Sequence, residues 1–200
     1  NFIILALVNF FLVDFFAVKS TMRTEKISES FMLTKFSDFM PFFSGSSLNV
    51  SFLIALTVAV ISYILIYKTK FGYELRAVGF NKTASKFIGL KVNKITLIAF
   101  FIGAGMTSLS GINFIFGYKG FYEMGFSSNI GFTAIAVALL AKNNPIGIIF
   151  SSLLFAILEY GGLSVNQQVP KEIMLVVQGV IILAILSVDK IVNNYFEKRI

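Results

Sequence analysis

The chain has 200 residues, of which 56% are hydrophobic and only 14% charged, and its net charge is +7. A soluble domain carries about a quarter charged residues, so this composition excludes a disordered chain and an ordinary water-soluble enzyme and indicates an integral membrane protein. Cys and His are both absent, which argues against disulfides, zinc sites and a Ser–His catalytic relay. We therefore expect no catalytic residues, no cofactor and no metal ligands.

Four apolar segments are suited to crossing a membrane as helices, which takes about 20 residues each. In chain order they are residues 1–18, 48–67, 95–116 and 173–188. The first segment starts at Asn rather than Met and has no basic leader, so we expect no signal peptide and an N-terminally truncated fragment. The expected fold is an all-α, polytopic membrane helix bundle that forms a single transmembrane domain over residues 1–200.

Residues 125–160 follow a different pattern. An apolar run at 130–141 is only about 18 Å long as a helix, a Lys-Asn-Asn-Pro sequence follows at 142–145, and a second apolar run occupies 146–160. Neither piece comfortably crosses a hydrocarbon core of about 30 Å. Two interpretations stay open, a broken or re-entrant pair that lines a cavity and two short helices at a thin or tilted site.

The loops differ strongly in charge. Residues 68–94 contain seven Lys or Arg against the single acid Glu74, whereas residues 19–47 contain four bases and three acids, and the remaining loops are nearly neutral. Basic loops stay on the cytoplasmic side, so we expect 68–94 there, together with Lys142 and the tail at 189–200. Because the cations are segregated from the aromatic residues, we expect no binding to nucleic acid.

The middle of the basic loop predicts a short amphipathic helix. Four apolar residues share one face at i, i+4, i+7 and i+8 spacing, with Asn81 as a plausible N-cap and Gly89 as a plausible C-terminal stop. The residues of this face are Phe80, Ala84, Phe87 and Ile88. Such a helix lies on lipid headgroups or docks into a groove of a soluble partner. The loop's composition leaves both interpretations open.

In the third apolar segment, small side chains recur at every fourth residue, at Ala99, Gly103, Thr107 and Gly111. Such a stripe allows close helix–helix packing in lipid, so these four are our candidate packing residues.

Three polar residues lie within or at the ends of apolar runs, at Asn113, Thr133 and Gln178. Polar groups at membrane depth often face a pathway, which makes these the candidate substrate-pathway residues. Interhelical hydrogen bonding is the favoured interpretation for each amide by itself.

No phosphate-binding glycine loop of the type G-x-x-x-x-G-K-[ST] is present. If the protein moves solute uphill, nucleotide chemistry must therefore come from another chain. An ATPase-independent channel or carrier remains an alternative, although neither paired intramembrane charges nor an inverted repeat is visible.

Three blocks of sequence carry a family resemblance. TKFGYELRAVGFNK at 69–82, followed by Ala84, Ile88 and Gly89, is similar to an FG-x-x-LRA-[VI]-G-x-N pattern that leads into a short cytoplasmic helix. The second block is GFTAIAVALLAKNNP at 131–145, and the third comprises a Val-Pro pair at 169–170, Ile173 and QGVIIL at 178–183. Together they resemble permease subunits of bacterial ABC importers of the branched-chain amino acid, simple-sugar and nucleoside type, nearest the nucleoside and simple-sugar branch.

The chain departs from the family pattern at two positions. Ala141 stands where Gly is usual, and Phe80 stands where an acidic residue is common.

The resemblance implies a permease without catalytic residues, which sits in the bacterial inner membrane as a multi-pass protein and transports a nucleoside or simple sugar. A branched-chain amino acid is the alternative substrate. Implied partners are cytoplasmic ABC ATPases, a second permease subunit, an extracytoplasmic binding protein and membrane lipid. The segment at 68–94 would be the coupling loop that meets the ATPase. Its implied coupling residues are Arg76, Gly79, Asn81, Ala84, Phe87, Ile88 and Gly89.

Overall fold

The computed structural model describes residues 2–18, 21–39, 42, 44–127 and 130–165, together with residues 173, 176, 179, 180, 183 and 187. Contacts divide the chain into two units, Asn1–Ser128 and Asn129–Ile200. Within the described residues every regular element is a helix, and β-structure is limited to isolated bridges such as Ala17 with Thr24. The predicted all-α membrane bundle is confirmed.

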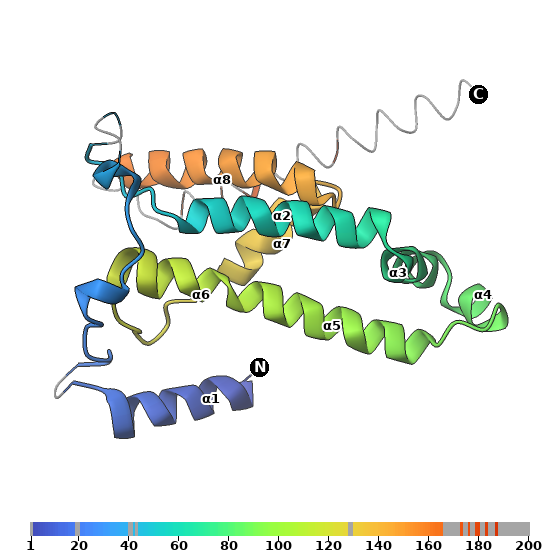
Figure 1. Ribbon diagram of the computed structural model, residues 1–200, viewed down its shortest axis with the longest axis horizontal. Helices are drawn as coiled ribbons and strands as arrows, with labels where there is room; N and C mark the ends of the chain where they lie inside the picture. The colour runs from blue at the N-terminus through green and yellow to red at the C-terminus, as the bar shows by residue number, and fades with distance from the viewer. Residues whose placement is uncertain are drawn as a thin grey trace. The chain divides into compact units, whose positions relative to one another are not determined.

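The first unit is built around two long helices joined at one end by two short ones (Figure 1). Helix α3 packs against both α2 and α5, and α4 packs against α3 and α5. Helix α2 also meets the last turn of α5, where Ser62 Oγ lies 3.5 Å from Met106 Sδ. The helices of this unit are α1 (Phe2–Phe11), α2 (Ser51–Lys68), α3 (Lys70–Phe80), α4 (Lys82–Phe87), α5 (Val92–Ser108) and α6 (Ser110–Ile112), with π-helical η1 (Leu12–Phe16) and η5 (Asn113–Lys119) and 3₁₀ turns η2 (Glu29–Phe31) and η3 (Phe36–Asp38).

Among the described residues, three helical stretches are long and apolar enough to cross a membrane, namely Ser51–Lys68, Val92–Lys119 and Pro145–Gly162. The first two confirm the spans predicted at 48–67 and 95–116. The stretch Ile3–Phe16 is apolar but shorter. Most of the segment predicted at 173–188 lies outside the described residues.

The second span is not a uniform α-helix. Helix α5 ends at Ser108, a turn at Leu109 leads into α6, and η5 then continues as a π-helix to Lys119. Hydroxyl groups bond back to the preceding turn at this point, from Thr107 to the Gly103 carbonyl at 2.9 Å and from Ser108 to the Gly105 carbonyl at 2.7 Å. Such bonds compete with the regular helical ladder and locally bend a helix.

The second unit contains α7 (Ile130–Leu140) and α8 (Pro145–Val165), which pack against each other. The turn between them holds Lys142 and Asn143 in the left-handed region, with φ of 51° and 56°. The Asn144 side chain then accepts the Ile146 amide at 2.9 Å at the start of α8. The predicted interruption at 142–145 is thus confirmed.

The predicted shortness of the second apolar piece is wrong. The sequence placed its end at residue 160, whereas α8 continues through Gly161 and Gly162 to Val165 and is 21 residues long. Glycine is tolerated within membrane helices, so the Gly pair does not end the helix. Of these two pieces, α7, with 11 residues, remains too short to span by itself.

At the end of the first unit away from α3 and α4, two loops pair with each other. The amides of Thr24, Ile27 and Leu33 donate to the carbonyls of Tyr122, Gly120 and Phe116 at 2.7–2.9 Å. The Lys119 ammonium lies 3.1 Å from the Glu123 carboxylate in the same region. The described part of the weakly charged loop at 19–47 and the basic loop at 68–94 therefore lie at opposite ends of the spanning helices of the first unit, as the predicted topology requires.

Candidate functional site

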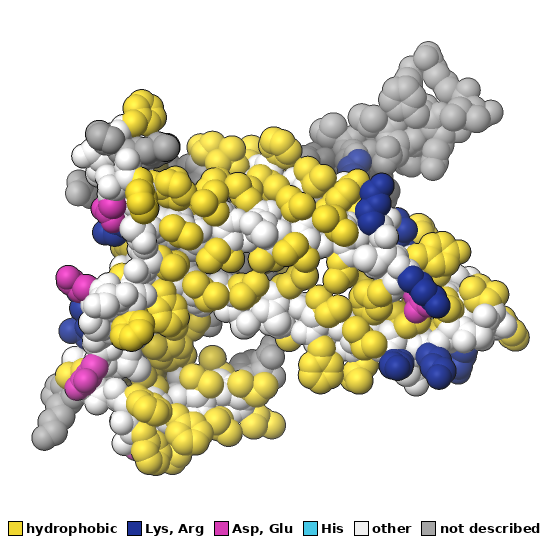
Figure 2. Space-filling view, in the orientation of Figure 1, with side chains coloured by type: hydrophobic (Ala, Val, Ile, Leu, Met, Phe, Trp, Pro, Cys, Tyr) yellow, Lys and Arg dark blue, Asp and Glu magenta, His cyan; other side chains and the backbone are white. Residues whose placement is uncertain are grey.

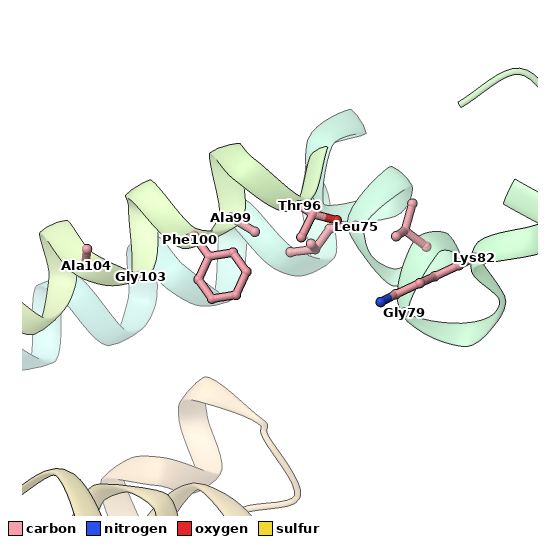
Figure 3. A pocket seen from close by; sticks show the side chains of 9 residues that line it. Leu75, Gly79, Lys82, Thr96, Ala99, Phe100, Gly103 and Ala104 are labelled. Carbon is pink, nitrogen blue, oxygen red and sulfur yellow. The ribbon is translucent and has the colours of Figure 1, made fainter. Parts of the chain in front are cut away.

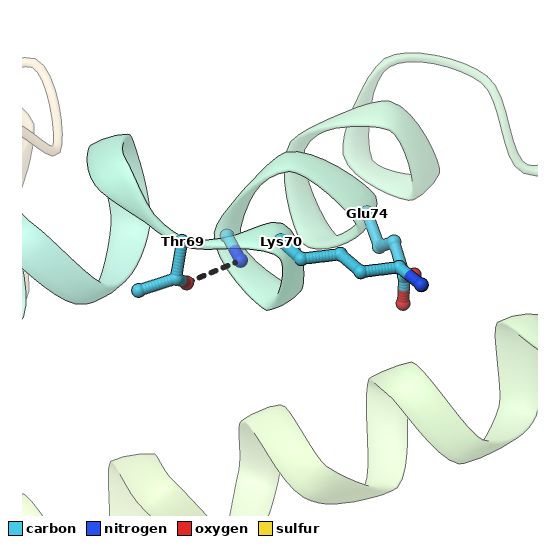
Figure 4. A network of polar contacts seen from close by, with 4 residues as sticks. Thr69, Lys70 and Glu74 are labelled. Atoms are coloured by element: carbon cyan, nitrogen blue, oxygen red, sulfur yellow. Dashed lines mark hydrogen bonds and ion pairs between the residues drawn. The ribbon is translucent and has the colours of Figure 1, made fainter.

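A sharp elbow joins α2 to α3 and positions the predicted coupling loop. Thr69 has an extended backbone, its Oγ1 donates to the Leu65 carbonyl at 2.6 Å, and the same oxygen accepts the Gly72 amide at 3.1 Å (Figure 4). Gly72 is buried, and a Cβ there would overlap the main-chain carbonyl oxygens of Leu65 and Ile66. The first turn of α3 thus lies directly on the last turn of α2, and only glycine permits this approach.

Two charged contacts support the elbow. The Arg76 guanidinium lies 5.1 Å from the centre of the Tyr67 ring, a cation–π contact between α3 and the end of α2. Lys70 Nζ lies 4.0 Å from Glu74 Oε1 (Figure 4), but the Lys70 side chain is 91% exposed, so this pair contributes little to stability. Arg76, a predicted coupling residue, is therefore half-buried against its own chain.

Helix α4 is short but capped at both ends. The Asn81 side chain accepts the Ala84 amide at 3.0 Å, which confirms the predicted N-cap. At the other end Gly89 has φ +86° and donates to Lys86, while the Leu90 amide donates to the Ser85 carbonyl at 3.0 Å. These two bonds form a Schellman motif and confirm the predicted stop. A helix of only six residues is stable here because the backbone groups at both of its ends form hydrogen bonds with nearby residues.

The predicted apolar face is exposed. We call Phe80, Ala84, Phe87 and Ile88 the coupling face; the exposed fractions of its three large members are 90%, 87% and 72% in that order. Ser85 is instead turned inward and is 2% exposed. One detail of the prediction is wrong, because Phe80 ends α3 and does not belong to α4. The extended backbone of Asn81 separates the two helices.

Positive charge surrounds the coupling face. In Figure 2 the Lys and Arg side chains gather over α3, α4 and the start of α5. Most of the visible Asp and Glu side chains lie over the loops at the far end of the first unit. Glu74 is the single acid of the basic loop and lies near Lys70. An exposed apolar patch within a basic loop is typical of a surface that contacts a partner.

A groove of about 550 Å³ lies between α3 and α5 (Figure 3). Its walls are almost entirely apolar, and Lys82 lies at one end. Gly79, predicted as a coupling residue, lines this groove and is not part of the coupling face. The lining residues are Leu75, Val78, Gly79, Lys82, Thr96, Ala99, Phe100, Gly103 and Ala104.

A polar cluster lies at the start of α2 and of η5. The Asn113 Oδ1 accepts from Asn49 Nδ2 at 3.2 Å and from Ser51 Oγ at 2.8 Å. Asn49 is 5% exposed and also donates to the Gly117 carbonyl at 3.1 Å. The interhelical hydrogen bond favoured for Asn113 is therefore present.

Neither of the other two pathway candidates belongs to the first unit. Thr133 is half-buried on α7 in the second unit, and Gln178 lies outside the described residues. The pathway role of the three candidates stays a prediction.

The small-residue stripe faces open space within the described part of the first unit. Ala99 and Gly103 line the groove, and a Cβ built on Gly103 or Gly111 has no described heavy atom within 4 Å. The packing role predicted for the stripe stays a prediction.

Sequence reasoning missed Thr69, Gly72 and Asn49. A threonine three residues before a glycine at the end of an apolar run is an N-cap signal that would have predicted α3. Asn49 gives no local signal, because its partner Gly117 is 68 residues away.

Comparisons with known proteins agree on one family. A family model described as branched-chain amino acid transport system, permease component, matches residues 1–186. The chain is 38% identical over 140 residues to the nucleoside ABC transporter permease protein NupB of Lactococcus lactis, covering 69% of this chain and 38% of that protein.

Two further relatives agree. The guanosine ABC transporter permease protein NupP of Bacillus subtilis is 34% identical over 169 residues, covering 82% of this chain and 48% of NupP. The glucose ABC transporter permease protein TsgB13 of Haloferax volcanii is 31% identical over 144 residues, covering 71% and 38%. The chain thus spans less than half the length of these relatives. No solved structure matches it.

Proposed function

Because the chain belongs to the family of permease components of branched-chain amino acid transport systems, we propose that it forms part of the permease of an ATP-driven importer. The solute is a nucleoside or a simple sugar, by similarity to NupB, NupP and TsgB13. The protein lies in the cytoplasmic membrane and crosses it several times. Separate ATPase subunits, a second permease subunit and an extracytoplasmic binding protein complete the transporter.

The exposed coupling face carries this proposal. Its large side chains are mostly exposed, although Phe87 and Ile88 lie at the end of a helix that is capped at both ends and Phe80 ends the helix that the elbow holds. Burying one such side chain contributes about 1.5–3 kcal/mol before the costs of association. A short, well-capped helix in a basic loop that exposes apolar side chains is suited to bind in a groove of a soluble partner, where those side chains are removed from water. We assign that groove to the ATPase.

A substitution at the centre of the coupling face tests the assignment. Ala84→Asp places a carboxylate in the apolar contact, and an unpaired buried charge is strongly unfavourable. We expect Ala84→Asp to insert into the membrane normally but to reduce ATPase co-purification at least tenfold and to abolish solute uptake. Lys86→Ala is the matched control on the same helix, and we expect it to retain most of both activities, since exposed ion pairs contribute little.

The opposite ranking would support the headgroup interpretation of this helix. If Ala84→Asp binds the ATPase fully while Lys86→Ala loses it, the coupling assignment is wrong, because attraction to anionic lipid depends on lysines. If both variants keep full ATPase binding, the coupling face is not the contact surface.

A further inference from the structure

The groove between α3 and α5 has no role in the proposed function. It lies beside the coupling face but does not include Phe80, Phe87 or Ile88. Its α5 wall belongs to the span Val92–Lys119, so the groove enters the membrane-spanning part of the first unit.

The dimensions of the groove suit a lipid chain. Its α5 wall runs from Thr96 to Ala104, which is about 12 Å along a helix at 1.5 Å per residue. One leaflet contributes about 15 Å of hydrocarbon, half of the core of about 30 Å. Apart from Thr96 and Lys82, the lining side chains are aliphatic or, at Phe100, aromatic, and Phe100 is 75% exposed. A groove of this length and lining can hold most of the depth of one acyl chain.

The positive charge of Lys82 at one end of the groove determines which lipid headgroup fits there. Figure 3 shows the Lys82 side chain reaching from α4 towards Gly79, with its ammonium group at the groove. The loop's single acid, Glu74, lies 4.0 Å from Lys70, whereas Lys82 has no ion pair within the described residues. A cation that ends an apolar groove at the cytoplasmic interface favours a phosphate with net negative charge over a zwitterionic headgroup.

We propose that this groove binds one anionic phospholipid of the cytoplasmic leaflet, with an acyl chain along α5 and its phosphate at Lys82. Such a lipid contacts α3, α4 and α5 together, so its binding stabilises the packing of α4 against α3 and α5.

Native mass spectrometry tests the proposal on the intact protein that contains this chain. The purified protein in mild detergent is titrated with phosphatidylglycerol or with phosphatidylcholine of the same acyl chains. We expect the first phosphatidylglycerol to be retained at least tenfold more strongly than phosphatidylcholine. Lys82→Gln should reduce this preference to near unity. Lys86→Gln is the matched control, since it removes the same charge from α4 at a residue that does not line the groove; it should keep the preference.

A filling variant tests the apolar part independently. Ala104→Phe places a ring within the groove, so retention of both lipids should fall. The proposal is overturned if Lys82→Gln binds phosphatidylglycerol like the unmodified protein, or if Lys86→Gln loses as much as Lys82→Gln. It is also overturned if Phe100→Cys, in this chain without Cys, crosslinks quantitatively to a second copy in membranes. These readouts need no ATPase, so they are independent of the coupling assignment.

Discussion

Replacing Gly72 by Ala should destabilise the elbow that holds the coupling loop. A Cβ at this residue overlaps the carbonyl oxygens of Leu65 and Ile66, which belong to the main chain of α2 and cannot rotate away. The whole first turn of α3 must therefore move off α2. That movement also lengthens the hydrogen bond from the Gly72 amide to Thr69.

The magnitude follows from two opposing effects. In an unobstructed helix, Gly→Ala is favourable by about 1 kcal/mol, whereas overpacking costs about 1–3 kcal/mol and sometimes more. The rigid main-chain neighbours place Gly72→Ala at the upper end of that range, so we expect a net loss of about 2 kcal/mol. Gly79→Ala is the matched control in the same helix, because no described heavy atom lies within 4 Å of its Cβ. It should be neutral or gain up to about 1 kcal/mol.

Resistance of the detergent-purified protein to thermal unfolding measures the difference. Gly72→Ala should unfold well below Gly79→Ala, and it should also co-purify with less ATPase because α4 is carried on α3. If Gly72→Ala is as stable as Gly79→Ala, the close contact between α2 and α3 is absent from the native protein, and α3 is not held firmly against α2.

One other glycine and the topology give further predictions. Gly117→Ala brings a Cβ within 2.5 Å of Asn49 Nδ2, so it should destabilise the protein by about 1–3 kcal/mol in the same thermal assay; no loss would show that the polar cluster is loose. With single Cys residues in this Cys-free chain, Ser44→Cys should react with an impermeant thiol reagent in intact cells, whereas Thr83→Cys should react only after permeabilisation. Labelling of Thr83→Cys from outside would reverse the predicted orientation.

The sequence predicted best what depends on bilayer thickness and on local caps. The spans at 48–67 and 95–116 follow from the length of hydrocarbon that must be crossed. The ends of α4 follow from Asn81 and Gly89, whose hydrogen bonds reach only a few residues along the chain.

The sequence did not predict features that depend on contacts between distant residues, nor a helix end that no local signal marks. Helix α3 mixes basic, apolar and glycine residues, so it has no simple apolar period, and its stability comes from packing on α2 and α5. The pairing of Asn49 with the Gly117 carbonyl requires two segments far apart in sequence to meet. The end of α8 was misplaced because a Gly pair after Tyr160 resembles a loop start in water but not in a membrane.

The arrangement of the short helices explains how a force on α4 reaches the membrane spans. Asn81 is the single residue between α3 and α4, and its side chain accepts the Ala84 amide, so α4 begins directly after it. Helix α3 is fixed to α2 by the Gly72 contact and by Arg76 on Tyr67, and it also packs against α5. We therefore expect a displacement of α4 to move the same end of both spans together rather than to bend one of them. Because packed interfaces shift between discrete arrangements rather than deforming continuously, we expect closure of the proposed ATPase partner to move α2 and α5 together through this single helix.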